Sequence, residues 1–195
     1  MKKGQLHKLQ SFLSTKKNIV IVPHRIPDGD AMGSTLALSQ YFNSKGHLAT
    51  VVAPNEYPDF LHWLPESKKV LLFDKQNKQA KRAIANSDII FLLDFNTLHR
   101  VGDDMAKTLE VYGNDFAMID HHQQPDSVAT YLYSDTSICS TAQMVYHFLE
   151  MLKDTDAITK DIATCLYTGI MTDTGSFRFR STTSETHRIV AKLIE

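Results

Sequence analysis

The first stretch able to do chemistry is a loop that combines His24 with two carboxylates, Asp28 and Asp30. An imidazole and two hard oxygen donors form a ligand set suited to a divalent metal such as Mn²⁺. Pro27 stiffens the turn, and Gly29 lets the backbone bring the two carboxylates towards one point. Taken alone, the loop is equally an Asp-Gly turn whose aspartate caps the helix that follows.

Two further stretches place metal-binding residues directly after an apolar run. Asp94 follows five consecutive apolar residues, and Asp120, His121 and His122 follow the apolar run 116–119. Adjacent histidines in a strand point to opposite faces, so we expect one imidazole on the metal and the other towards substrate. Asp120 suits the role of an acceptor that fixes the tautomer of a ligating imidazole. The alternatives are a helix cap at Asp94 and a pair of surface histidines.

A fourth stretch carries one carboxylate, Asp173, among glycine and hydroxyl residues. Asp173 is a further candidate ligand, and the neighbouring hydroxyls could hydrogen-bond it or bind phosphate. Arg178 and Arg180 alternate along what we expect to be a short extended segment, so both would point to one side as phosphate contacts. Arg100 is a third candidate phosphate contact. Arg178 and Arg180 are equally solvated surface residues, and for Arg100 taken alone the surface position is the favoured interpretation.

Regular elements flank each of these stretches. The apolar runs 18–22, 89–93 and 116–119 predict buried strands, and helical spacing follows at 31–45 and again from residue 160. Strands alternate with helices to the end of the chain, which predicts an α/β fold: a mostly parallel sheet flanked by helices on both faces, in a three-layer Rossmann-like arrangement. Such sheets place their sites at the carboxyl ends of the strands, where the first three stretches are expected to meet, while the fourth lies at the end of the helical stretch from residue 160.

Composition limits the functions that fit. The chain has 195 residues, which suits one domain, and its formal net charge of −1 argues against a domain that tracks a long nucleic acid. A small phosphorylated substrate remains compatible, and a homo-oligomer stays open. Cys139 and Cys165 lie in no metal or redox spacing, which predicts buried, reduced thiols. No apolar run has the length of a membrane span and the N-terminus has no signal-peptide core, so we expect a cytoplasmic protein without a membrane partner.

The motifs and their order resemble the DHH phosphoesterase superfamily. That superfamily includes RecJ-type exonucleases, family II inorganic pyrophosphatases, exopolyphosphatases and the nanoRNase/pAp-phosphatase group. The matching motifs are His24-x-x-x-Asp28-x-Asp30, Asp94, Asp120-His121-His122 and Asp173, and they cover residues 18–177. The strings His-Arg-Ile-Pro-Asp-Gly-Asp-Ala-Met-Gly-Ser and Gly-Ile-Met-Thr-Asp-Thr-Gly-Ser-Phe are most similar to the nanoRNase/pAp-phosphatase branch.

The resemblance implies a two-metal site. One ion would take His24, Asp28 and Asp94, and the other Asp30, Asp94, His121 and Asp173, with Asp94 bridging the two. Imidazole ligands favour Mn²⁺, with Mg²⁺ as a substitute. His122 would bind a phosphate oxygen or protonate the leaving group. We also expect the removal of Asp94 to relieve repulsion among the carboxylates of the metal-free protein.

The function implied is Mn²⁺-dependent hydrolysis, by a metal-activated water, of short oligoribonucleotides or of nucleotide phosphates such as pAp. The alternatives are a pyrophosphatase or exopolyphosphatase activity, and a metal- or nucleotide-binding domain that is inactive without its partner domain. The branch carries a C-terminal substrate-binding domain with a glycine-rich stretch ending in histidine, which residues 1–195 lack. We therefore interpret residues 1–195 as the catalytic domain alone, in preference to a truncated gene product.

Overall fold

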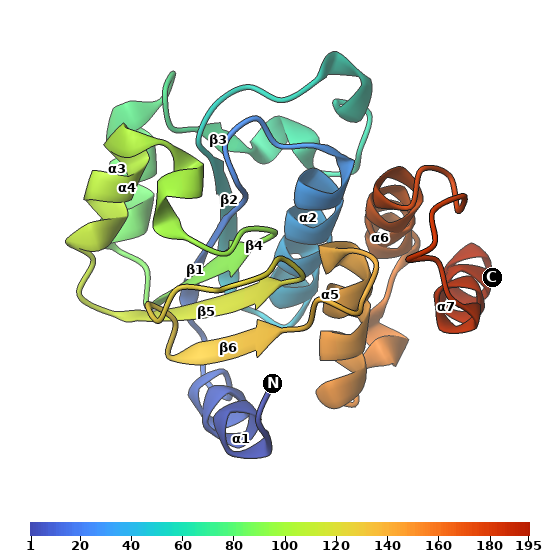
Figure 1. Ribbon diagram of the computed structural model, residues 1–195. Helices are drawn as coiled ribbons and strands as arrows, with labels where there is room; N and C mark the ends of the chain where they lie inside the picture. The colour runs from blue at the N-terminus through green and yellow to red at the C-terminus, as the bar shows by residue number, and fades with distance from the viewer.

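The computed structural model describes residues 1–195 and contains a six-stranded sheet with helices on both faces (Figure 1). The sheet order is β3-β2-β1-β4-β5-β6, and all neighbouring strands run parallel. The strands are β1 (Asn18–Val22), β2 (Leu48–Ala53), β3 (Leu71–Leu72), β4 (Ile89–Leu93), β5 (Asp115–Asp120) and β6 (Tyr131–Ser134). The predicted α/β fold with a mostly parallel sheet is confirmed.

The sheet separates two hydrophobic cores, because successive side chains of a strand point to opposite faces. Ile19 and Ile21 of β1 belong to the larger core, whereas Val20 and Val22 belong to the smaller one. The larger core packs under α1 (Lys3–Phe12), α2 (Gly29–Ser44), α5 (Thr141–Met151), α6 (Lys160–Asp173) and α7 (Ser184–Ile194). The smaller core packs under α3 (Asn77–Ala85) and α4 (Asp103–Glu110), on the opposite side of the sheet in Figure 1.

Helices α2 and α6 pack closely because two glycines face each other across the contact. A Cβ atom at Gly33 would lie 2.5 Å from the backbone oxygen of Cys165, and one at Gly169 would lie 2.5 Å from the Cβ of Ala142. The Gly169 position would also approach Oδ1 of Asp30 to 2.9 Å. The absence of side chains at these glycines thus brings Asp30 on α2 close to α6, which ends at Asp173.

The segment after α6 differs from the prediction. Residues 174–182 form turns rather than an extended segment, because the carbonyl oxygen of Thr174 accepts the N–H groups of both Arg178 and Phe179. Ser176 and Phe177 adopt positive φ angles of 60° and 65° in these turns. The expectation that Arg178 and Arg180 alternate along an extended strand is therefore wrong.

The cysteines and the apolar character of the helices were also the subject of predictions. Cys139, which precedes α5, and Cys165, which lies in α6, are both buried and free, as predicted. None of the helices combines the length and the apolar character needed to cross a bilayer.

Candidate metal centre

The candidate ligands gather at the carboxyl ends of β1, β4 and β5. From β1 the chain builds the sheet through β2 and β3 on one side, and β4 then pairs with β1 on the other side. The order in which strands are added to the sheet therefore reverses between β1 and β4, and such a switch point leaves a crevice outside the carboxyl ends of the strands. Seven side chains converge there: His24, Asp28, Asp30, Asp94, His121, His122 and Asp173.

The first donor set consists of His24, Asp28 and Asp94. Nε2 of His24 lies 3.8 Å from Oδ2 of Asp28 and 3.6 Å from Oδ2 of Asp94. Nδ1 of His24 is 2.9 Å from the carbonyl oxygen of Arg25, which places the proton on Nδ1 and leaves Nε2 free as a ligand. Asp28 does cap α2, since its Oδ1 accepts the N–H groups of Asp30 and Ala31. Its Oδ2 remains available to the donor set.

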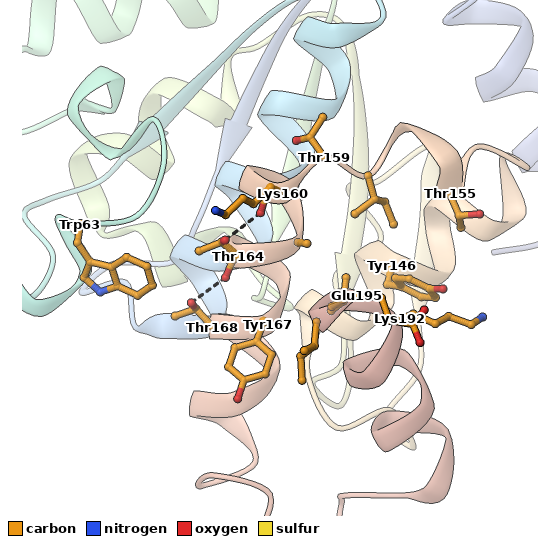
Figure 2. A pocket seen from close by; sticks show the side chains of 14 residues that line it. Trp63, Tyr146, Thr155, Thr159, Lys160, Thr164, Tyr167, Thr168, Lys192 and Glu195 are labelled. Atoms are coloured by element: carbon orange, nitrogen blue, oxygen red, sulfur yellow. Dashed lines mark hydrogen bonds between the residues drawn. The ribbon is translucent and has the colours of Figure 1, made fainter.

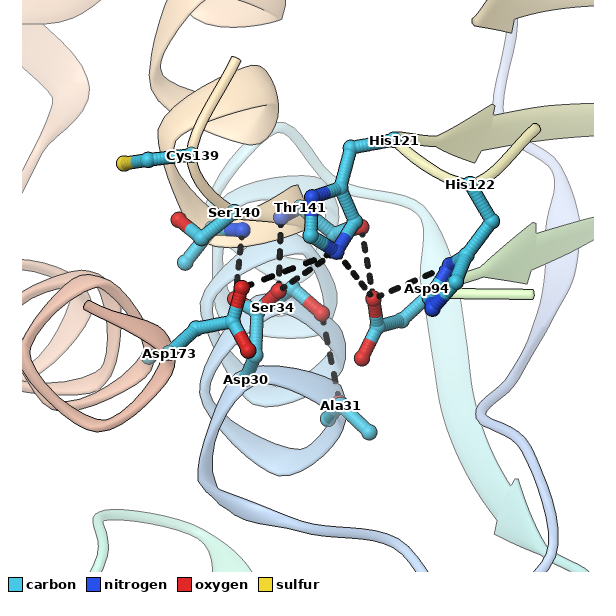
Figure 3. Close-up of polar contacts among 12 residues, drawn as sticks. Asp30, Ala31, Ser34, Asp94, His121, His122, Cys139, Ser140, Thr141 and Asp173 are labelled. Atoms are coloured by element: carbon cyan, nitrogen blue, oxygen red, sulfur yellow. Dashed lines mark hydrogen bonds and ion pairs between the residues drawn. The ribbon is translucent and has the colours of Figure 1, made fainter. Parts of the chain in front are cut away.

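The second donor set consists of Asp30, His121 and Asp173, with Asp94 alongside (Figure 3). Nε2 of His121 lies 3.5 Å from Oδ1 of Asp94, 3.6 Å from Oδ2 of Asp173 and 4.0 Å from Oδ2 of Asp30. Nδ1 of His121 lies 3.3 Å from the carbonyl oxygen of Ile138, which again directs Nε2 into the cluster. His24 and His121 therefore share the arrangement that orients metal-binding imidazoles.

Asp94 lies between the two donor sets. Its Oδ2 faces His24 and its Oδ1 faces His121, and only 3% of its side chain is exposed. Asp94 has a φ angle of 67°, a left-handed conformation that aspartate and asparagine tolerate better than most residues. The backbone turn that follows β4 thus points one carboxylate towards both sets.

The charges in this cluster perturb one another strongly. Burial, followed by the charges of Asp94 and Asp173, raises the pKa of Asp30 well above its ordinary value. Burial also raises the pKa of Asp173 to about 6, although the charge of His121 opposes the shift. For Asp94, burial acts to raise the pKa, but the neighbouring His121 and His24 outweigh it and hold the pKa below its ordinary value. Protons on the histidines balance the buried carboxylates here, and divalent cations would take over that role when bound.

The distances in both sets fit interposed cations better than hydrogen bonds. The histidine-to-carboxylate separations of 3.5–4.0 Å are long for direct hydrogen bonds. Ligand atoms roughly 2.1 Å from a common ion lie about 3 to 3.5 Å apart at octahedral or tetrahedral angles. The donor atoms of each set lie within 4.8 Å of one another, so modest movement suffices to close them around an ion. Imidazole nitrogens with carboxylate oxygens suit Mn²⁺ and related divalent ions.

The adjacent histidines differ from the predicted strand geometry. β5 ends at Asp120, so His121 and His122 lie beyond the strand and both rings approach Asp94, with His122 Nδ1 at 4.0 Å from Oδ1. Asp120 contacts His122, not His121, because its Oδ1 lies 2.7 Å from Nδ1 of His122. This contact requires the proton on Nδ1 and leaves Nε2 of His122, a side chain 41% exposed, free for a substrate.

The predicted phosphate contacts are less well placed than the candidate ligands. Arg178 is exposed and donates through Nε to the carbonyl oxygen of Gly175, and Arg180 is exposed without a hydrogen bond. Arg100 is exposed in a short 3₁₀ helix, Leu98–Val101, and its carbonyl oxygen accepts the N–H of Arg25. No ion pair holds any of the three arginines.

The hydroxyl residues around Asp173 do not hydrogen-bond that carboxylate, which was one of the two roles expected for them. Thr172 and Thr174 donate back to carbonyl oxygens of α6, and Ser176 donates to the sulfur of Met171. The hydroxyls near Asp173 therefore support the end of α6 and do not hydrogen-bond the carboxylate.

The start of α5 contributes contacts that the motifs do not reveal. The N–H groups of Thr141 and Ala142 donate to the two carboxylate oxygens of Asp30, at 2.6 and 2.8 Å. The hydroxyl of Thr141 donates to Oδ1 of Asp94 at 2.9 Å. Nothing in the sequence pattern at the start of α5 indicates these partners.

A separate surface cavity of about 910 Å³ lies between α5, α6, α7 and the loop that carries Trp63 (Figure 2). Tyr146, Tyr167 and Lys192 are among its lining residues. None of the candidate ligands lines this cavity, so the metal centre is a distinct feature of the fold.

Fold and site together define a doubly wound α/β domain with a candidate centre for two metal ions. Among such domains, the chain belongs to the DHH family: the model described as DHH family, N-terminal domain, matches residues 18–170. The resemblance inferred from the order of the motifs is thereby confirmed.

Two curated relatives carry the same name. The chain is 33% identical over 180 residues to the bifunctional oligoribonuclease and PAP phosphatase NrnA of Thermus thermophilus, which aligns 90% of this chain with 49% of that protein. The NrnA of Bacillus subtilis is 26% identical over 187 residues, with 94% of this chain and 54% of that protein aligned. The chain thus spans about half the length of these relatives.

Solved structures agree on the fold. An exopolyphosphatase-related protein from Bacteroides fragilis superposes with a TM-score of 0.95 at 36% identity, covering 99% of this chain and 56% of that one. The exonuclease RecJ bound to manganese superposes with a TM-score of 0.56 at 15% identity, covering 98% of this chain and 46% of that one. The second similarity extends to the fold alone.

Proposed function

We propose that this chain is the catalytic domain of a Mn²⁺-dependent phosphoesterase. Its substrates would be short oligoribonucleotides or nucleotide phosphates such as pAp, in line with the names of the relatives from Thermus thermophilus and Bacillus subtilis. The observation that carries the proposal is the pair of donor sets at the switch point of the sheet, with Asp94 a member of one set and facing His121 of the other. We assign base and ribose recognition mainly to the part of those relatives that lies outside the aligned half.

The roles of the residues follow from their contacts. Divalent ions held by the two donor sets would activate a water molecule and neutralise charge that develops on the phosphate. The His122 side chain is 41% exposed and its Nδ1 is taken by Asp120, so Nε2 is available to bind a phosphate oxygen or, when protonated, to protonate the leaving group. Asp120 holds the His122 ring in one tautomer through Nδ1. The exposed Arg100, Arg178 and Arg180 remain candidates for outer phosphate contacts only.

Hydrolysis of a phosphoanhydride is the second candidate. It is favoured by the similarity to the exopolyphosphatase-related protein from Bacteroides fragilis, at 36% identity over nearly the whole chain. The donor sets suit either reaction, because both displace an oxygen leaving group from phosphorus with the same charges to neutralise.

One assay separates these functions. The protein is stripped of metal with a chelator, and phosphate or nucleotide release from pAp, a diribonucleotide and pyrophosphate is followed before and after Mn²⁺ is restored. We expect Mn²⁺ to restore hydrolysis of pAp and the dinucleotide. Pyrophosphate as the best substrate would favour the second candidate. Binding of Mn²⁺ without any hydrolysis would identify a binding domain that is inactive by itself.

His121 and His122 are expected to respond differently to substitution. His121→Ala should raise the Mn²⁺ concentration for half-activation, because it removes a nitrogen that faces three carboxylates. His122→Ala should keep Mn²⁺ affinity and lower turnover by about 100- to 10,000-fold, the usual contribution of a general acid. Calorimetry with Mn²⁺ and steady-state kinetics measure the two effects. Equal loss of Mn²⁺ binding in both variants would place both imidazoles on the metal.

Residues 1–195 alone are expected to discriminate weakly among substrates. The described cluster offers metal ligands and His122 but few groups that could hold a base or ribose, and such remote contacts supply energy that orients the reacting phosphate. Rates on pAp, a dinucleotide and a simple aryl phosphate should therefore lie close together. A preference of several hundredfold for either nucleotide would show that specificity already resides in these residues.

A further inference from the structure

The first turn of α5 contacts two candidate metal ligands at once. Thr141 is fully buried; its N–H donates to Oδ2 of Asp30 and its hydroxyl donates to Oδ1 of Asp94 (Figure 3). The N–H of Ala142 donates to the other oxygen of Asp30. The partners are 47 or more residues apart in the sequence, so the contacts exist only in the folded domain.

These contacts complete the hydrogen bonding of the helix start. The first N–H groups of a helix have no partner within it. In α5, Asp30 accepts the first two of them, and the side chain of the N-cap residue Ser140 accepts the N–H of Gln143. Asp30 therefore lies against two directed donors that fix the rotation of its carboxylate.

The hydroxyl of Thr141 has a different consequence for Asp94. A carboxylate shared by two donor sets must keep one oxygen towards each, which requires one rotation of its terminal torsion. That torsion is soft in aspartate, with broad rather than sharply defined minima. Oδ1 faces His121 while it accepts the Thr141 hydroxyl, and Oδ2 faces His24. The left-handed backbone conformation fixes the direction in which the Asp94 side chain projects. Among neutral hydrogen-bond donors, only the Thr141 hydroxyl binds the carboxylate, and it binds Oδ1 and not Oδ2.

We propose that Thr141 is a positioning residue that holds the Asp94 carboxylate across the two donor sets, so that each oxygen serves a different one. The inference rests on the proposed two-metal function and adds a residue outside its ligand set. If the hydroxyl only satisfied a buried polar contact, its removal would lower stability alone. In the proposed role, its removal also weakens Mn²⁺ binding and the magnetic coupling between two ions bound to the shared carboxylate.

The test compares Thr141→Val, which keeps the shape and the backbone N–H but loses the hydroxyl, with Thr141→Ser, which keeps the hydroxyl. Thr168→Val is the matched control, since Thr168 is also buried on a helix but donates only to the carbonyl oxygen of Thr164. Each metal-free protein is titrated with Mn²⁺ alone, by calorimetry and by electron paramagnetic resonance. Two Mn²⁺ ions joined by a carboxylate give an exchange-coupled spectrum, which isolated ions do not give.

We expect the wild type, Thr141→Ser and Thr168→Val to show the coupled spectrum. Thr141→Val should lose it and bind Mn²⁺ about 10- to 100-fold more weakly, as is typical when the group that orients a ligand is removed. A coupled spectrum and unchanged affinity in a folded Thr141→Val protein would overturn this inference while leaving the two-metal site in place. A wild-type protein that binds no coupled pair would overturn the inference and the proposed function together.

Discussion

Replacing Asp94 by asparagine is expected to lower Mn²⁺-dependent hydrolysis by about a thousandfold or more, which corresponds to about 4 kcal/mol of transition-state stabilisation. Asp94 is the one carboxylate that faces both donor sets, so its loss weakens both at once. Asparagine keeps the shape and tolerates the left-handed backbone at φ 67°, which makes it a better substitution than alanine. Initial rates with pAp and a dinucleotide at saturating Mn²⁺ measure the effect.

The same variant tests the electrostatics of the metal-free protein. From the sequence alone we expect removal of this charge to relieve repulsion, but the structure places Asp94 against two histidines and the Thr141 hydroxyl. The expectation is therefore reversed: Asp94→Asn should lower the melting temperature without metal, because His24 and His121 lose their shared carboxylate.

In the activity measurement, hydrolysis by Asp94→Asn within tenfold of wild type would exclude Asp94 as a shared ligand.

Gly33→Ala is expected to destabilise the domain by about 3 kcal/mol, at the upper end of the usual cost of overpacking. The added Cβ would lie 2.5 Å from the backbone oxygen of Cys165 and 2.9 Å from the backbone nitrogen of Gly169. Backbone atoms of a packed helix cannot rotate away, so α2 and α6 would have to separate. For a domain of this size the melting temperature should fall by roughly 6 to 12 °C.

Gly4→Ala is the matched control for this substitution. Gly4 also lies in a helix, α1, but a Cβ there would meet no atom within 4 Å. Alanine should stabilise that position by about 0.5 to 1 kcal/mol, since glycine costs more conformational entropy in a helix. Thermal unfolding of both variants gives the comparison. Equal stability of Gly33→Ala and wild type would contradict the close packing of α2 on α6.

The parts of the fold that the sequence predicts well are those with a local signal. The runs at β1 and β4 are apolar on both faces, so they indicate central strands of a parallel sheet, and both have the expected positions. The candidate ligands other than Asp173, which ends helix α6, follow from residue types at the ends of such runs. Their convergence in space also follows, because parallel strands bring their carboxyl ends to one edge.

The parts that were missed depend on contacts without a local signal. The bonds from Thr141 and Ala142 to Asp30 join residues more than 100 positions apart. The turns at Ser176 and Phe177 place non-glycine residues at positive φ, which their residue types do not indicate. The contact of Asp120 with His122 depends on the residue at which β5 ends. The ends of a strand are the feature that a sequence predicts least accurately.

We propose that one chain holds two divalent ions through a carboxylate, Asp94, that faces both donor sets. Calorimetric titration of the metal-free protein with Mn²⁺ tests it most directly, with Asp94→Asn titrated in parallel. We predict two ions per chain for the wild type, and weaker binding with fewer than two ions for Asp94→Asn. A wild-type protein that binds no Mn²⁺, or an Asp94→Asn protein that binds two ions with unchanged affinity, would contradict the account.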